Sequence, residues 1–298
     1  MAPSEKQVAE SVLMIRPVAF RSNPETASSN GFQADPATLD PMMEQRAAAT
    51  QFQGLVDTLR AARVQVVVEP DTPDPETPDS IFPNNWVSFH GDGTVVTYPM
   101  MAPNRRSEVR ADVIERLSND HGYRVEQIVD LAANAESGHF LEGTGSMVLD
   151  RVNRVAYACL SERTTLEGLG EFSQLLDYEI VAFEAWDRYG VAIYHTNVMM
   201  TVGEGFAVIC DATIEDSGQR AAVLRKLEDT GHEIVSITRD QMWSFLGNCL
   251  QLQAEDGSRV IAMSRRAEDA LTTDQAARLR HHGRIVSSPI HDIERSSG

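Results

Sequence analysis

The sequence contains few cysteines, no long apolar run and no cluster of basic residues. Its three cysteines, Cys159, Cys210 and Cys249, are odd in number, and their spacings fit neither a zinc site nor a disulfide framework. We therefore expect three reduced thiols in a cytoplasmic protein. No apolar stretch reaches membrane-spanning length, and the N-terminus lacks the basic and apolar regions of a signal peptide.

The charge balance is acidic. The formal net charge is −18 at pH 7, from 26 Lys and Arg against 44 Asp and Glu. An acidic chain repels phosphate backbones and anionic lipid, so we expect neither a nucleic-acid nor a membrane partner. At 298 residues the chain is long enough for a full hydrophobic core. The oligomeric state stays open between a monomer and a homo-oligomer.

One helix-to-strand phrase occurs five times. Each copy joins the end of an amphipathic helix to a β-branched run, at 59–70, 117–130, 175–185, 227–240 and 279–292. In three copies the residues between helix and strand include a glycine, at Gly122, Gly231 or Gly283, where a helix C-cap needs a left-handed residue. Recurrence at intervals of roughly 50 to 60 residues indicates one repeated supersecondary unit.

Between the expected helices, alternating runs around turn residues predict four hairpins. They cover 81–98, 146–160, 191–211 and 248–264. We expect a polar loop over 21–36, a fifth helix over about 267–281 and a flexible segment over 294–298. The cycled β-β-α-β pattern predicts a single α/β domain over 1–298, closed so that strand ends meet at one central site.

Two phrases place polar residues before expected strands. DSIFPNNW contains Asp79 and Asn85, which point to the same side if the segment is extended. Turn chemistry is the commoner explanation of Asp-Ser and Asn-Asn pairs. LEGTGS puts Glu142 inside a glycine-rich turn that enters a strand; no helix follows it, so we exclude a phosphate loop.

Two further phrases lie at corresponding points of later units. YHTNVMM places His195 and Asn197 two residues apart in an expected strand, so both side chains face one way. FLGNCLQL places Cys249 at the start of another strand. Each residue alone is more often structural. In a closed ring, however, the four phrases converge, giving an acid, a histidine and a thiol for nucleophilic catalysis.

Three of these phrases, DSIFPNNW, LEGTGS and YHTNVMM, together with IRPVAF, APNRRSE and LSERTT, resemble the amidinotransferase superfamily of guanidino-modifying enzymes. That superfamily includes arginine deiminase, dimethylarginine dimethylaminohydrolase and glycine amidinotransferase, and the chain is most similar to the bacterial citrulline-utilisation hydrolases. The resemblance implies the pentein fold, a pseudo-symmetric five-bladed ββαβ propeller, and catalysis that needs no cofactor or metal.

The resemblance also implies residue roles. Glu142 corresponds to the acid of the catalytic triad and His195 to its general acid/base. Arg105 or Arg106, and Arg163, correspond to the residues that bind the α-carboxylate of an amino-acid substrate. The full set of implied substrate-binding residues is Asp79, Asn84, Asn85, Arg105, Arg106, Arg163 and Asn197.

The chain departs from the superfamily pattern at two amides. Arginine-type members hold the guanidinium cation between two aspartates, and those positions are Asn85 and Asn197 here. Two amides cannot neutralise a guanidinium, but they can donate to and accept from a neutral ureido group. The substitutions therefore favour citrulline or a similar urea over arginine.

The second departure concerns the nucleophile. In the superfamily it is a cysteine near the C-terminus, and no cysteine follows Cys249 in this chain. We expect that a short C-terminal segment is lacking; the alternatives are an inactive relative or a substitute role for Cys249. The resulting hypothesis is a Cys-His-Glu hydrolase that converts citrulline to ornithine, ammonia and carbon dioxide. Its alternatives are an arginine or methylarginine deiminase-type hydrolase or amidinotransferase, and an inactive amino-acid-binding protein.

Overall fold

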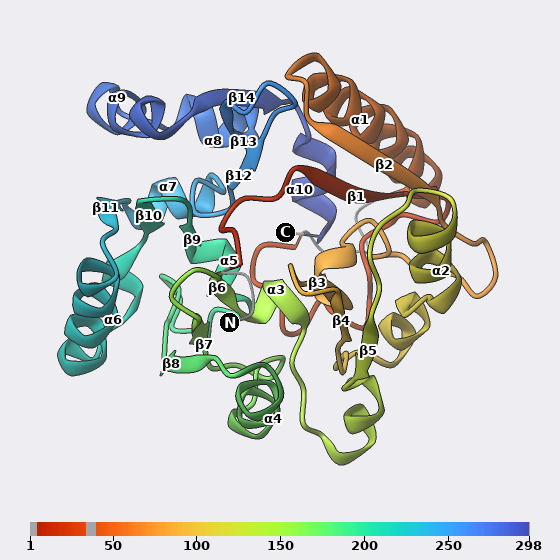
Figure 1. Ribbon diagram of the computed structural model, residues 1–298, viewed down its shortest axis with the longest axis horizontal. Helices are drawn as coiled ribbons and strands as arrows, with labels where there is room; N and C mark the ends of the chain where they lie inside the picture. The colour runs from red at the N-terminus through yellow and green to blue at the C-terminus, as the bar shows by residue number, and fades with distance from the viewer. Residues whose placement is uncertain (1–4, 34–39, 298) are drawn as a thin grey trace.

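The structure, a computed structural model, describes residues 5–33 and 40–297. It is an α/β fold with five separate small sheets, four of three strands and one of two. Figure 1 shows the sheets set around the middle of the molecule, with the longer helices on the outside. This arrangement directs one end of several strands toward a common region, where the cavity described below lies.

The four three-stranded sheets share one topology. In each, the first two strands are antiparallel and the third pairs in parallel with the second. They are β3 (Val87–Phe89), β4 (Thr94–Thr97) and β5 (Gln127–Asp130); β6 (Val148–Asp150), β7 (Val155–Cys159) and β8 (Glu179–Phe183); β9 (Met200–Val202), β10 (Phe206–Ile209) and β11 (Glu233–Ser236); and β12 (Leu250–Gln253), β13 (Arg259–Ser264) and β14 (Arg284–Ser288). A hairpin lies within each of the four expected ranges, but β3 and β9 begin only at Val87 and Met200, so the first strands of two hairpins are shorter than expected.

The remaining sheet has only two strands. β1 (Ser11–Arg16) pairs in parallel with β2 (Gln65–Pro70), with α1 (Pro41–Ala61) between them in the chain. The pair thus matches the second and third strands of the other sheets. Within the described residues, no strand joins the other edge of β1 in the position that β3, β6, β9 and β12 hold elsewhere.

Five longer helices precede the parallel strands. They are α1, α2 (Ala111–Asn119), α4 (Leu166–Leu176), α6 (Ser217–Asp229) and α9 (Thr273–His282). Each buries an apolar stripe against its sheet; in α1 the buried residues include Phe52, Val56 and Leu59. No helix in the described ranges is both long and apolar enough to cross a bilayer.

The shorter helices lie in the connections. They are α3 (Gly143–Ser146), α5 (Thr196–Met199), α7 (Arg239–Trp243), α8 (Arg265–Asp269), α10 (His291–Ser297) and the 3-10 helices η2 (Pro83–Asn85), η3 (Pro103–Glu108), η4 (Ala132–Ser137) and η5 (Asp211–Thr213). In Figure 1, α3, α5 and α10 lie nearer the middle than the five longer helices.

The repeated helix-to-strand phrase is confirmed in all five copies, but one predicted cap is wrong. Gly122 and Gly231 take the left-handed conformation, with φ of 72° and 83°. Gly283 has a φ of 169° and is extended. At the other two breaks Arg63 and Asp177 adopt φ of 64° and 55° without being glycine. Four of the five helix–strand breaks therefore contain a residue with positive φ, and only two of those four residues are glycines.

Two predictions near the C-terminus are wrong. The expected helix over 267–281 is two helices, α8 and α9, because Thr272 caps a new helix through a capping box. Residues 294–297 are helical in α10, whereas Gly298, like 34–36 of the expected loop, lies outside the described residues. α10 packs on α1, where Gln51 donates to Asp292 over 2.6 Å and Ile293 is buried.

Candidate active site

A cavity of about 970 Å³ lies where the sheets converge. Each three-stranded sheet contributes the residues just before its first strand. Asn85 precedes β3, Thr144 precedes β6, Asn197 precedes β9 and Cys249 precedes β12, and all four line the cavity. The topology therefore explains why corresponding points of successive units meet here.

Glu142 and His195 form a hydrogen bond beside this cavity. The two atoms, Oε2 of Glu142 and Nε2 of His195, are 2.8 Å apart, and both side chains are buried. Glu142 stands at the N-terminus of α3 and His195 at the N-terminus of α5. The expected extended strand at 194–199 is wrong, since a helical turn begins directly after His195, and the same-side argument for Asn197 no longer holds.

The Glu142 carboxylate is surrounded by positive charge and donors. Its Oε2 lies 3.4 Å from Arg105 and 3.6 Å from Arg163, while the backbone N–H of Met101 donates to Oε1 over 3.1 Å. Burial on its own would raise the pKa of Glu142, but Arg163, His195 and Arg105 together hold it well below its usual range. Glu142 is therefore a carboxylate, and it only accepts hydrogen bonds.

His195 is a neutral base in this environment. Burial lowers its pKa to about 4, outweighing the opposite effect of Glu142. Because the Glu142 carboxylate can only accept, the ring proton lies on Nε2 and Nδ1 keeps its lone pair. A neutral imidazole oriented by a carboxylate can accept a proton at Nδ1 and later release it, as general acid–base catalysis requires.

Arg105 connects three acidic residues and an amide. Its guanidinium donates to both oxygens of Glu108, over 2.9 and 3.0 Å, and to Asn85 Oδ1 over 3.0 Å. Nε is 3.6 Å from Asp79 Oδ2. Although burial opposes it, these anions raise the pKa of Arg105. Burial in turn raises the pKa of Glu108 to about 7 despite the arginine beside it.

Glycines at 143 and 145 allow the residues of two sheets to approach closely. A Cβ at Gly145 would lie 2.3 Å from Asn85 Nδ2 and 2.8 Å from His195 Nδ1. A Cβ at Gly143, where φ is 47°, would lie 2.3 Å from the carbonyl oxygen of Asn84. Neither position has space for another side chain. The LEGTGS phrase forms one helical turn, α3, where no helix was expected.

Arg163 is held by the loop before α1. Its Nε and Nη2 donate to the hydroxyl of Ser29, over 3.1 and 2.7 Å, and Nη2 donates to the Thr26 carbonyl over 3.2 Å. The guanidinium also lies over the ring of Tyr194, 4.8 Å from its centroid. The partners of Arg163 are thus mainly neutral, unlike those of Arg105.

The other expected substrate-binding residues fall into two groups. Asp79, Asn84 and Asn197 line the cavity, and Asn23 donates to Asp79 Oδ2 over 2.8 Å. The segment 81–85 contains the 3-10 helix η2 and not an extended strand, so the same-side argument for Asp79 and Asn85 is wrong. Arg106, by contrast, does not line the cavity. It pairs with the exposed Glu136 over 3.2 Å and donates to the carbonyl oxygens of Met100 and Met101.

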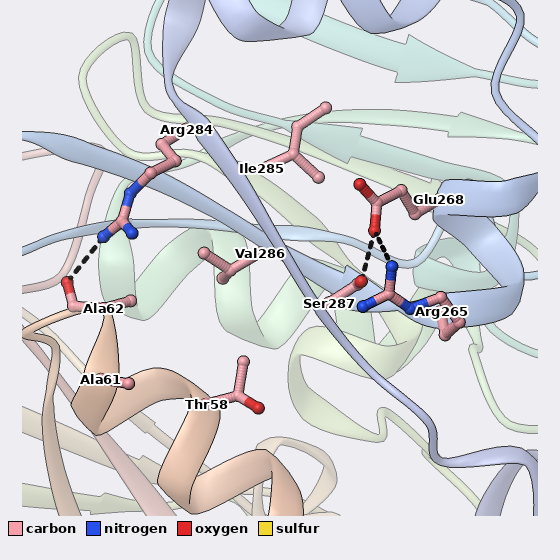
Figure 2. Close-up of a pocket in the computed structure, with 9 residues that line it drawn as sticks. All are labelled: Thr58, Ala61, Ala62, Arg265, Glu268, Arg284, Ile285, Val286 and Ser287. Carbon is pink, nitrogen blue, oxygen red and sulfur yellow. Dashed lines mark hydrogen bonds and ion pairs between the residues drawn. The ribbon is translucent and has the colours of Figure 1, made fainter.

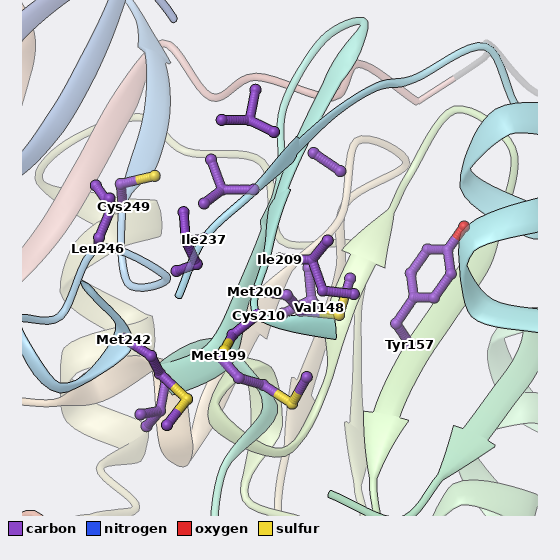
Figure 3. Packing of buried hydrophobic residues seen from close by; sticks show 14 of the residues in the cluster. Val148, Tyr157, Met199, Met200, Ile209, Cys210, Ile237, Met242, Leu246 and Cys249 are labelled. Atoms are coloured by element: carbon purple, nitrogen blue, oxygen red, sulfur yellow. The ribbon is translucent and has the colours of Figure 1, made fainter. Parts of the chain in front are cut away.

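Cys249 lines the same cavity in an apolar environment. Figure 3 shows it beside Leu246, among the buried side chains around β9 and β10. Burial raises the pKa of its thiol to about 12, and burial raises those of Cys159 and Cys210 equally. These raised pKa values keep the three thiols protonated at neutral pH, which makes each unreactive unless a neighbouring base accepts its proton.

A second cavity, of about 410 Å³, lies between α1, α8 and β14. Figure 2 shows Arg284 donating to the Ala62 carbonyl at one side and Arg265 paired with Glu268 at the other. It contains no histidine or cysteine. The cavity beside Glu142 and His195 is therefore the candidate active site.

The site includes residues that the sequence interpretation did not identify. Glu108 fixes Arg105, and Ser29 and Asn23 hold Arg163 and Asp79. The Arg105–Glu108 spacing of three residues was the available signal, because it brings the two side chains together on a helical turn. No local pattern indicated the roles of Ser29 and Asn23.

Comparison with known proteins gives the family. A sequence model described as N,N dimethylarginine dimethylhydrolase, eukaryotic, matches residues 16–298. No curated protein matches the sequence. Among solved structures, the arginine dihydrolase ArgZ from cyanobacteria superposes with a TM-score of 0.72 and 16% identity, covering 95% of this chain and 38% of that one.

Two further structures agree with this fold. The N-terminal domain of ArgZ, as a cysteine-to-serine variant bound to substrate, gives a TM-score of 0.71 at 16% identity, over 95% of this chain and 93% of that one. A dimethylarginine dimethylaminohydrolase adduct gives 0.60 at 15% identity, over 96% and 94%. The chain thus spans about two fifths of full-length ArgZ and most of its N-terminal domain. The match over 16–298 shows that the chain belongs to the N,N dimethylarginine dimethylhydrolase family, within the amidinotransferase (pentein) superfamily of guanidino-modifying enzymes.

Proposed function

We propose that the protein hydrolyses the ureido C–N bonds of citrulline, giving ornithine, ammonia and carbon dioxide with one water consumed. The observation that carries this proposal is the buried contact of 2.8 Å between Glu142 and His195 beside a cavity lined by Asn85 and Asn197. Where arginine-type relatives place two aspartates, these amides carry no charge that would balance a guanidinium, whereas a neutral ureido group needs none.

In the proposed mechanism a cysteine thiol passes its proton to Nδ1 of His195. The thiolate attacks the ureido carbon, and the imidazolium, stabilised by Glu142, protonates the departing amine. His195 then takes a proton from water, which attacks the carbonyl carbon of the thiocarbamate and breaks its C–S bond. The proton returns to the sulfur, and the carbamic acid that forms decomposes to carbon dioxide and the second amine. No step requires a metal or a cofactor.

For the nucleophile we propose a cysteine on a strand added to the open edge of β1, in preference to Cys249. Each complete sheet supplies a cavity residue just before its first strand, whereas within residues 5–33 and 40–297 no such strand pairs with β1. β1 residues 12–14 line the cavity, so an added strand would reach it. The raised pKa of Cys249, about 12, argues against Cys249 itself.

For the substrate we propose that Arg163 binds the α-carboxylate through Nη1 alone, since its Nε and Nη2 already donate to Ser29 and Thr26. Its hydroxyl and carbonyl partners leave its charge less neutralised than that of Arg105. Asp79, Asn84, Asn85 and Asn197 would then contact the remainder of the amino acid. This assignment also fits a small amino-acid ligand in a cavity of this size.

We further propose that the five sheets are the blades of a five-bladed ββαβ propeller in which one blade lacks a strand. The shared strand order of the four complete sheets and the equivalent position of β1 and β2 support this proposal. An experimental structure with the fifth sheet completed by an antiparallel strand on β1 would test it.

Two other functions have specific support. Solved relatives are described as an arginine dihydrolase and a dimethylarginine dimethylaminohydrolase, which favours arginine or methylarginine as the substrate, or amidino transfer. The three protonated thiols favour an inactive amino-acid-binding protein.

The experiment that separates these functions measures ornithine and ammonia release from citrulline and from arginine in parallel, with Cys249→Ala beside the unaltered chain. Ornithine from citrulline alone supports the proposal, and turnover of arginine alone refutes it. Loss of activity in Cys249→Ala would make Cys249 the nucleophile. Citrulline binding without turnover would indicate the binding protein.

A further inference from the structure

Arg105 has no free edge with which to bind a substrate carboxylate. The edge formed by Nε and Nη2 donates to the two oxygens of Glu108, over 2.9 and 3.0 Å. On the other edge, Nη2 also donates to Asn85 and Nη1 donates to Glu142 over 3.4 Å. A bidentate clamp needs two N–H groups on one edge, and both edges are engaged. Arg105 must therefore have a different role from the carboxylate binding that the resemblance implied.

The contact with Arg105 fixes the orientation of the Asn85 amide. A guanidinium has only donors, so the atom of Asn85 that faces it over 3.0 Å must be the carbonyl oxygen Oδ1. The NH2 group is then directed to the opposite side. There, Nδ2 approaches the Cβ position of Gly145 to 2.3 Å, and His195 Nδ1 approaches the same point to 2.8 Å.

The orientation decides what Asn85 can offer a ligand. Its Oδ1 is turned toward Arg105, which occupies one of the two lone pairs, whereas Nδ2 lies on the side where His195 Nδ1 also approaches the Cβ position of Gly145. A guanidinium consists of donors and presents no acceptor, so it cannot pair with an N–H group. A ureido group carries a carbonyl oxygen, which can accept from Asn85. A free asparagine, by contrast, could rotate and present its oxygen to either substrate.

We propose that Arg105, held in place by Glu108, is a positioning residue that fixes Asn85 as an N–H donor and thereby selects carbonyl-bearing ureido substrates over guanidinium substrates. The inference rests on the proposed function, because it concerns the same site and names the feature that discriminates its substrates. Glu108 bonds Arg105, and Arg105 bonds Asn85, so Glu108 acts on a bound substrate through these two residues. We therefore expect a change at Glu108 to alter substrate selectivity as well as the packing of the site.

The test compares two variants with a matched control, using calorimetric affinities for citrulline and arginine. Asn85→Asp supplies a second acceptor oxygen, so we expect citrulline to bind at least about tenfold more weakly relative to arginine. Glu108→Gln loosens Arg105 and should lower the citrulline-to-arginine preference about fivefold. Glu136→Gln removes the carboxylate from the neighbouring Arg106, outside the cavity, and should leave the preference unchanged.

A second readout does not depend on ligand binding. The side-chain amide signals of Asn85 in a 15N–1H NMR spectrum are assigned by their loss in Asn85→Asp. We expect them to shift or broaden in Glu108→Gln and to stay in place in Glu136→Gln. Unchanged Asn85 signals in folded Glu108→Gln would overturn the positioning role, whether or not either ligand binds.

The outcomes for the two proposals are distinct. If the unaltered protein prefers citrulline but neither Asn85→Asp nor Glu108→Gln changes that preference, the inference is wrong and the proposed function stands. If the unaltered protein prefers arginine, the proposed function fails and the inference about selectivity fails with it. Citrulline preference that falls in both variants, with the NMR change confined to Glu108→Gln, supports both.

Discussion

Two sides of the same cavity differ in how they are built. On one side Glu142, His195, Arg105 and Arg163 form a buried network in which every charge has a partner. On the other side Cys249 lies among apolar side chains, and burial raises its pKa against the smaller, opposite effect of the Thr201 hydroxyl. The first side keeps Glu142 ionised and His195 neutral, whereas the second keeps a thiol protonated. The contrast shows that proximity to a cavity does not make a residue catalytic; electrostatic surroundings do.

The largest expected effect on stability comes from removing a charge from the network of Glu142, His195, Arg105 and Arg163. Glu142→Gln removes the anion that Arg105, Arg163 and His195 all face, and so leaves buried guanidinium charge uncompensated. We expect the free energy of unfolding in denaturant at pH 7 to fall by about 3–5 kcal/mol. Glu136→Gln, on the exposed partner of Arg106, is the control and should change it by less than about 1 kcal/mol. Equal effects of the two variants would contradict the network.

The second prediction concerns the pH dependence of stability that the lowered pKa of His195 produces. Because the pKa of His195 falls from its ordinary value of 6.5 to about 4 in the folded protein, the neutral ring contributes stability above pH 6.5. That contribution is lost as pH falls from 6.5 to 4 and amounts to about 3 kcal/mol.

The measurement is the difference in unfolding free energy between the unaltered protein and His195→Asn across this range. The difference should shrink as the pH is lowered, since only the unaltered protein must take up a proton on unfolding. A difference that is constant from pH 7 to pH 4 would show that His195 has an ordinary pKa.

The third prediction tests the crowding between sheets. Gly145→Ala inserts a Cβ that would meet Asn85 Nδ2 at 2.3 Å and His195 at 2.8 Å. We expect a loss of about 1–3 kcal/mol in stability and the loss of citrulline binding. In Gly170→Ala the added Cβ meets no atom within 4 Å, in helix α4, so that variant should be neutral or stabilised. Citrulline binding retained in Gly145→Ala would argue against the convergence of these residues.

The smallest expected effect is on the thiol side. Cys249→Ala removes one buried sulfur and should cost about 1 kcal/mol of stability. With a pKa raised to about 12, the thiol should also react with an alkylating reagent at pH 8 only after denaturation. Rapid alkylation of the native protein at Cys249, assigned by mass spectrometry, would show that the pKa of this thiol is not raised and that its surroundings are not apolar.

The sequence allowed the repeated elements to be predicted because their signals are local. Helical stripes such as Phe52, Val56 and Leu59 and the following β-branched strand are read within one short segment. The approach of Glu142 to His195 also followed from the repeat, since equivalent points of a ring meet.

The errors share a physical cause. At Pro83–Asn85 and Thr196–Met199 short helical turns replace the expected strands. The Thr196 hydroxyl bonds the Ser146 carbonyl and the Cys159 N–H, which are distant in the sequence. The orientation of Arg105 could not be predicted, because it depends on Glu108 on its own turn and on Asn85 and Glu142 from two different sheets. Such contacts are fixed by tertiary packing and leave no pattern in the sequence.

The packing of α10 on α1 has a consequence for the order in which the molecule assembles. Each complete sheet, with its helix, comes from one contiguous stretch of chain, so its loop-closure entropy is small. The contact between Gln51 and Asp292 instead joins residues 241 positions apart. On a ribosome the four complete sheets can therefore form in turn, while the contact between α1 and α10 closes only after Asp292 has been synthesised. Until that moment the apolar face of α1 that receives Ile293 stays exposed, and it is there that chaperones would be expected to bind the nascent chain.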